Sequence, residues 1–214
     1  MYGFVTHTWN TVKGKCPHDC PYCYMKRYPQ TELHFDEKEL KTDLGEENFI
    51  FVGSSCDMFA DDIPPEWIIA TLMHCEKFNN EYLFQTKNPE AYSGYGANIA
   101  AIEDFVLCTT IETNRFYSDY MGSAPGPRER SLAMQKIPYN KKHVTIEPIM
   151  DFDLEFFLLF LLDCNPIQVN IGADSGGNNL PEPDKEKINT LIEELKNNNI
   201  QVHLKNNLKR LIKP

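Results

Sequence analysis

The sequence predicts an α/β protein with one domain over residues 1–214, built as a partial (β/α)6 barrel of the TIM type. Two patterns support this fold class. Short β-rich apolar segments alternate with helical patterns about six times, and several segments are apolar almost without interruption, as in parallel strands covered on both faces. A complete eight-unit barrel typically needs about 250 residues. The chain has 214, so a partial barrel fits its length better.

Seven segments have the composition of strands. Residues 4–6 form the weakest of them, because only three residues carry the pattern. The other six are rich in β-branched and aromatic residues and cover 48–53, 82–86, 105–110, 143–147, 167–172 and 200–204. Parallel α/β folds place their chemistry at the carboxyl ends of the strands, so the residues that follow these segments are the first candidates for a site.

Helical patterns occupy the intervals between these strands. Residues 184–197 form the clearest helix, because apolar side chains recur there at spacings of three and four while the other face is charged. Residues 65–78 begin with a proline that suits a first helical turn. Two more helices are expected at 129–136 and 153–163. The apolar run 156–162 predicts a buried helix, since a membrane span needs about 20 apolar residues.

Charge and cysteine content narrow the functional classes. The formal net charge of −10 argues against a protein that coats nucleic acid with its whole surface. Lys13, Lys15, Lys26 and Arg27 flank a cysteine cluster and are either solvated surface charges or a positive rim for an anionic ligand. Seven cysteines without a secretion signal make a disulfide framework a poor expectation and favour a cytoplasmic location.

Cys16, Cys20 and Cys23 lie within eight residues and predict a metal centre. Structural zinc requires four ligands, for which His18 or His7 could supply the fourth. An iron–sulfur cubane usually takes four cysteines, so three would leave one iron open. Trp9, just before this loop, either shields such a centre from water or packs in the core.

The spacing Cys-x3-Cys-x2-Cys, with the aromatic Tyr22 before the third cysteine, resembles the signature of the radical-SAM superfamily. The chain as a whole resembles a phage- and prokaryote-associated radical-SAM family of unassigned function. That family more often has Gly-Glu where this chain has Ala173-Asp174, and a longer region before Asp57. The matching segments are 8–10, 54–59 with Pro64, 85–90, 109–112, 145–148, 171–176 and 203–205.

The resemblance implies a radical-SAM barrel in which Cys16, Cys20 and Cys23 bind a [4Fe–4S] cluster. S-adenosylmethionine (SAM) would chelate the open iron and be cleaved by an electron from the cluster. The resulting 5′-deoxyadenosyl radical would abstract hydrogen from an unknown substrate. An external reductant such as flavodoxin or ferredoxin would supply the electron, and no membrane partner is expected.

Polar residues at the strand ends are the candidates for binding SAM and substrate. By position, Ser54, Ser55 and Asp57 resemble the segment that contacts the SAM amino group, although Asp57 could equally cap a turn. Lys87 suits the SAM carboxylate or an anionic substrate, or is a surface lysine. The other cofactor candidates are Tyr22, Thr110, Glu112 and Glu147, with Thr110 and Glu112 suiting the ribose, and the substrate-side candidates are Asn170, Asp174 and Lys205.

Two other functional interpretations remain open at the level of the sequence. The chain could be a non-catalytic zinc or iron–sulfur module that binds nucleic acid, which would hold metal but have no affinity for SAM. It could also be a radical enzyme that modifies or repairs a nucleic-acid base or nucleotide. Salt-sensitive binding to DNA or RNA would identify the latter.

Overall fold

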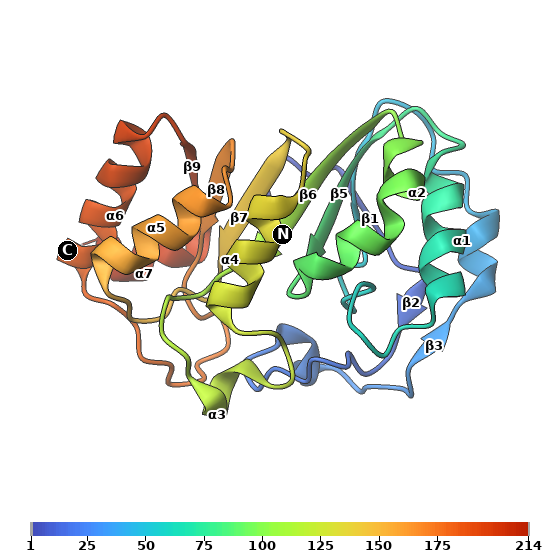
Figure 1. Ribbon diagram of the computed structural model, residues 1–214. Coiled ribbons are helices and arrows are strands. Elements are labelled where there is room, and N and C mark those ends of the chain that lie inside the picture. The colour runs from blue at the N-terminus through green and yellow to red at the C-terminus, as the bar shows by residue number, and fades with distance from the viewer. Residues whose placement is uncertain (1, 214) are drawn as a thin grey trace.

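The computed structural model describes residues 2–213 and contains a seven-stranded sheet in the order β1-β4-β5-β6-β7-β8-β9 (Figure 1). Every neighbouring pair is parallel. β1 pairs only with β4 and β9 only with β8, so the sheet stays open, and the predicted α/β fold with a partial barrel is confirmed. The strands are β1 His7–Trp9, β4 Phe49–Val52, β5 Glu81–Thr86, β6 Asp104–Thr110, β7 Lys142–Ile146, β8 Gln168–Ile171 and β9 Gln201–Leu204.

Helices connect successive strands, as the alternating pattern predicts. In Figure 1, α1 and α2 lie near the β1 end of the sheet and α5 and α6 near its β9 end. The longer helices are α1 Pro65–Cys75, α4 Pro127–Lys136, α5 Leu154–Asp163 and α6 Lys185–Asn197. Shorter elements are η1 Tyr24–Arg27, η2 Glu37–Lys41, η3 Pro89–Tyr95, α2 Gly96–Ala100, α3 Ser118–Met121, η4 Asn206–Leu208 and α7 Lys209–Ile212, with a small hairpin of β2 Val12–Lys13 and β3 His34–Phe35.

The first strand differs from the sequence prediction. It covers His7–Trp9, three residues later than expected, and His7 pairs with Ile50 of β4. The apolar residues that suggested an earlier strand cover the inner face of the sheet instead: Val5 is buried there against Leu83, Val106 and Cys108, and Phe4 packs on the same cluster. A short apolar segment can satisfy its burial without joining the ladder, which is why composition alone misplaced this strand.

Helix α5 also departs from its prediction. Phe157 and Leu161 are buried, but 61% of Phe156 and 55% of Leu159 is exposed, so the expectation of a buried helix is wrong. Successive residues of a helix point about 100° apart, and only one stripe of α5 faces the sheet. No helix within residues 2–213 is long and apolar enough to cross a membrane.

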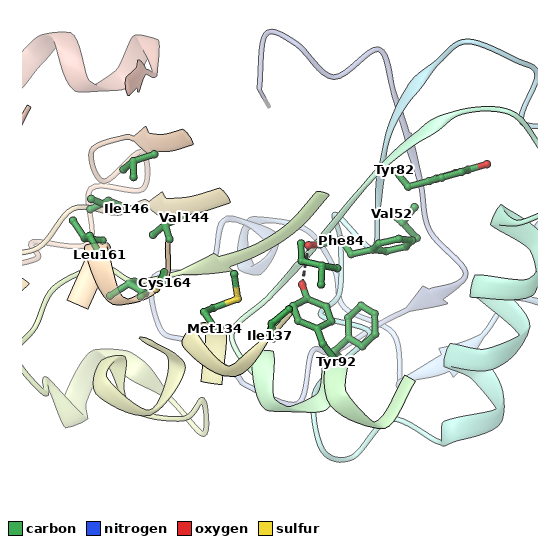
Figure 2. Packing of buried hydrophobic residues seen from close by; sticks show 14 of the residues in the cluster. Val52, Tyr82, Phe84, Tyr92, Met134, Ile137, Val144, Ile146, Leu161 and Cys164 are labelled. Carbon is green, nitrogen blue, oxygen red and sulfur yellow. Dashed lines mark hydrogen bonds between the residues drawn. The ribbon is translucent and has the colours of Figure 1, made fainter. Parts of the chain in front are cut away.

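The main core lies between the outer face of the sheet and the helices (Figure 2). Strand residues contribute alternately to the two faces, so Leu107 joins this core while its neighbours Val106 and Cys108 face inward. The Tyr92 hydroxyl donates to the Phe84 carbonyl at 2.8 Å, which fastens η3 onto β5. The outer core anchors the sheet and leaves its inner face and strand ends available for a site.

Candidate cofactor site

A cavity of about 820 Å³ opens at the carboxyl ends of the strands, and the segment carrying the three cysteines forms part of its wall. Two predicted residues, Glu112 and Asn170, lie outside the lining. The predicted residues that do line this cavity are Cys16, Cys20, Cys23, Tyr22, Ser54, Ser55, Asp57, Lys87, Thr110, Glu147, Asp174 and Lys205. Residues from six strand ends and one loop therefore meet at one place, as the parallel topology predicts.

The cysteine loop follows β2 and leads into η1. Turn hydrogen bonds hold it: the Asp19 amide donates to the Cys16 carbonyl at 3.1 Å, and the Cys23 amide donates to the Cys20 carbonyl at 3.0 Å. Cys20 is buried, whereas Cys16 and Cys23 are half-buried at the cavity. All seven cysteines carry free thiols, so the three in the loop are available as ligands.

The segment after α3 supports the cysteine loop from outside. The Ser123 amide donates to the His18 carbonyl at 2.8 Å, and the Cys20 thiol donates to the Met121 carbonyl at 3.7 Å. Gly122 has a φ of 58°, and a Cβ at this position would lie 2.0 Å from the His18 carbonyl oxygen. Only glycine allows the two backbones to approach this closely.

We expect Gly122→Ala to displace the cysteine loop. Both the clash with the His18 carbonyl and the positive φ oppose an alanine, so the free energy of unfolding should fall by about 1–3 kcal/mol. Chemical denaturation measures this change, and iron content after reconstitution measures the effect on the loop. Gly94→Ala is the matched control, because nothing lies within 4 Å of its Cβ position. Equal stability of the two variants would contradict the supporting role of this contact.

Cys56 is a fourth cysteine at the cavity, to which the sequence suggested no role. Its proximity to Cys16 lowers the pKa of Cys16 to about 6. The same interaction and burial raise the pKa of Cys56 itself. Burial likewise raises the pKa of Cys20. The contact joins residues 40 positions apart, and no spacing rule indicates it.

Asp57 connects the cysteine loop to the end of β5. Its carboxylate accepts hydrogen bonds from His18 Nε2 at 2.9 Å, the Thr86 hydroxyl at 2.9 Å and the Lys87 amide at 2.7 Å. Burial opposes its charge, but these donors hold the pKa of Asp57 below its ordinary value. Its other carboxylate oxygen accepts from the Phe59 amide at 3.1 Å, the local turn contact of the capping alternative. The pair with Asp57 also engages His18, one of the two histidines considered as zinc ligands.

A buried chain of polar groups connects the cysteine loop to α4. The Tyr22 hydroxyl, between Cys20 and Cys23 in sequence, donates to Glu112 and accepts from the Lys87 ammonium at 2.5 Å. Lys87 also pairs with Glu112, and Arg130 Nη1 donates to the other carboxylate oxygen at 2.8 Å. Burial alone would raise the pKa of Glu112, but Arg130 and Lys87 outweigh it and lower this pKa to about 2.

At the ends of β7 and β9, Glu147 pairs with Lys205 and accepts from the Asn207 amide at 2.8 Å. Gly172 permits this arrangement, because a Cβ there would lie 2.6 Å from a Glu147 oxygen. Tyr2 was not predicted to contribute, yet it lines the cavity, and the Lys205 ammonium lies 4.5 Å from its ring centre. Glu147 therefore has the partner that its predicted position at the barrel mouth requires.

Other predicted residues are held by neighbours within the chain. Ser54 and Ser55 both donate to the Asn10 side chain, at 3.2 and 3.0 Å. Asp174 closes its own turn by accepting from the Gly176 and Asn178 amides. Asn170 is buried below the cavity. Trp9 packs against His74 of α1, which is the core alternative, and His7 is exposed.

The three free thiols at the cavity are a donor set that suits an iron–sulfur cluster. Within residues 2–213, no three His, Cys, Asp or Glu side chains are close enough to share one metal ion. Three cysteines around one cavity, without a completed fourth ligand, agree with such a cluster in number and chemistry.

The sequence matches no protein-family model and no curated protein. It resembles solved structures of spore photoproduct lyase, a radical-SAM enzyme. A cysteine-to-serine mutant of that enzyme has a TM-score of 0.58 and 14% identity, with 77% of this chain and 55% of that chain covered. A cysteine-to-alanine mutant with dinucleoside spore photoproduct has a TM-score of 0.59 and 12% identity, with coverage of 86% and 59%.

A third structure of that lyase, a double mutant with bound AdoMet and dinucleoside spore photoproduct, has a TM-score of 0.58 at 12% identity, with 88% of this chain and 60% of that chain covered. This chain thus spans 55–60% of the length of the structures it matches. At these identities the likeness establishes the fold. The fold that the cysteine motif implied through its resemblance is the one observed.

Proposed function

We propose that this chain is a radical-SAM enzyme that binds a [4Fe–4S] cluster through Cys16, Cys20 and Cys23. The observation that carries the proposal is the cavity itself: three free thiols in radical-SAM spacing line the same cavity as the strand ends. The fold shared with spore photoproduct lyase supports it. When bound, such a cluster supplies the electron that cleaves SAM to methionine and a 5′-deoxyadenosyl radical able to abstract hydrogen.

The residues of the chain supply binding and orientation in this proposal. Lys87 offers an ammonium to the SAM carboxylate at the cysteine side of the cavity, where its side chain is still 16% exposed. Thr110 at the end of β6 offers a hydroxyl to the ribose. Glu112 could reach a ribose only by leaving Lys87 and Arg130, so we assign it no contact with SAM.

The substrate would lie across the cavity from the cysteine loop, against Glu147 and Lys205. These two side chains pair with each other and are 23% and 13% exposed, so a polar substrate could contact either without displacing the backbone. Asp174 borders the same wall. A one-electron donor such as flavodoxin or ferredoxin completes the proposed reaction.

Anaerobic reconstitution followed by electron paramagnetic resonance (EPR) of the reduced protein tests this function. We expect iron and sulfide near four of each per chain, and a spectrum that changes when SAM is added. An unchanged spectrum would contradict an open iron site. Stoichiometric zinc after anaerobic purification, with no affinity for SAM, would support the non-catalytic module instead.

A further inference from the structure

Arg130 is a fully buried arginine that reaches from α4 to the strand ends. Its Nε donates to the Pro125 carbonyl at 2.6 Å, and Nη1 donates to both the Thr110 carbonyl and Glu112 at 2.8 Å. Its side chain is 0% exposed, although its helix packs on the outer side of the sheet. A charged side chain is rarely buried unless it is paired, so its partners indicate its role.

In the group formed by Lys87, Arg130 and Glu112, two cations share one carboxylate. Lys87 and Arg130 are two cations, and Glu112 is the one carboxylate that both of them contact. Asp57 accepts from the backbone amide of Lys87, whereas the Lys87 ammonium contacts Tyr22 and Glu112. The Nη2 of Arg130 has no hydrogen-bond partner among the described residues.

This excess charge faces the cavity at Lys87. Arg130 and Glu112 are completely covered, whereas Lys87 is partly exposed and lines the cavity. Without Arg130, Glu112 would form a neutral pair with Lys87, and the wall would lose its attraction for anions. With Arg130, the carboxylate is shared, and the ammonium retains unneutralised charge in a site of low dielectric constant, where it acts strongly.

We infer that Arg130 is a positioning residue that holds and partly neutralises Glu112, so that Lys87 remains available to the carboxylate of SAM. This inference rests on the proposed function, because it identifies SAM as the carboxylate ligand. Arg130 does not line the cavity, so it would act on SAM only through Glu112 and Lys87.

The test compares SAM with decarboxylated SAM, which lacks only the carboxylate. Dissociation constants are measured by anaerobic calorimetry on cluster-loaded, unreduced protein, so that no turnover occurs. The dissociation constant for decarboxylated SAM divided by the constant for SAM reports recognition of the carboxylate. We expect Arg130→Met to lower this ratio about tenfold relative to wild type, the size of one charge-assisted hydrogen bond. Binding of the carboxylate to iron contributes equally to the ratio in wild type and in Arg130→Met, so it cancels when the two ratios are compared.

Variants that keep the charge of Arg130, or that remove the charge of Glu112 or Lys87, separate this role from a merely structural one. Arg130→Lys should retain most of the ratio, and Glu112→Gln should raise it, because Lys87 then faces the cavity, with Arg130 behind it, without a carboxylate between them. In a protein that already carries Lys87→Met, adding Arg130→Met should not lower the ratio further. A general disturbance of the wall would lower the ratio in every variant. Thermal unfolding of each protein identifies any variant that fails to fold.

The inference is overturned if Arg130→Met folds and keeps the wild-type ratio. If Arg130→Met does not fold, a ratio in Glu112→Gln about tenfold below wild type would overturn it instead. A wild type that binds both ligands equally, while SAM still changes its EPR spectrum, would refute the role of Arg130 and leave the proposed function standing. Absence of any SAM binding would refute both.

Discussion

A Cys20→Ser protein is expected to lose nearly all reconstituted iron and sulfide and to cleave SAM more than about 100-fold more slowly. Outer-shell partners of a metal site already contribute about 10–100-fold, and a direct ligand should contribute more. Serine preserves the size of the side chain and can keep the hydrogen bond to the Met121 carbonyl. The loss should therefore come from the missing thiolate, which is the ligand that iron requires.

Cys164→Ser is the matched control for this experiment. Cys164 is also buried and its thiol donates to the Phe160 carbonyl at 3.2 Å, but it lies in the outer core, away from the cavity. Its serine variant should load iron and release 5′-deoxyadenosine at wild-type levels. Normal iron content and cleavage in Cys20→Ser, or equal losses in both variants, would refute the assignment of the cluster ligands.

Glu112→Ala is expected to cause the largest loss of stability, about 3–5 kcal/mol in the free energy of unfolding. The substitution removes the carboxylate between Lys87 and Arg130 and leaves two cations near each other in the protein interior. Removing one partner of a buried ion pair costs more than the pair itself contributes, because the remaining charge stays desolvated. Urea denaturation measures the change.

The pH dependence of this stability provides a second measurement. The pKa of Glu112 is about 2 in the folded protein and about 4.3 in an unfolded chain. The unfolded chain therefore binds the proton first, and the stabilising contribution, complete above pH 4.3, is lost as the pH falls toward 2. Glu112→Ala should have a shallower decline over this interval than wild type.

Glu90→Ala serves as the control for Glu112→Ala. Glu90 is 64% exposed and lies 3.8 Å from Lys136, so its ion pair should contribute less than about 1 kcal/mol. A loss of similar size in the two variants would show that the buried network does not have the expected energetic weight.

Much of the fold could be predicted from local pattern. Alternation of apolar strands and amphipathic helices placed six strands within two residues of their observed bounds, and α6 begins immediately after its capping residue Asp184. The errors occurred where an apolar residue had more than one way to be buried. Phe4 and Val5 covered the sheet instead of joining it, and Phe156 faced outward on a helix that looked wholly apolar.

The sequence by itself determined the cysteine loop and the strand ends beside which it lies. Cysteine spacing and strand periodicity are properties of consecutive residues, so they can be read without knowing the packing. Only the tertiary structure decided that Cys56 contacts Cys16, that Arg130 reaches Glu112 through the wall, and that Tyr2 lines the cavity. These contacts join elements distant in sequence, and they depend on how helices and sheet pack and on which buried charges find partners.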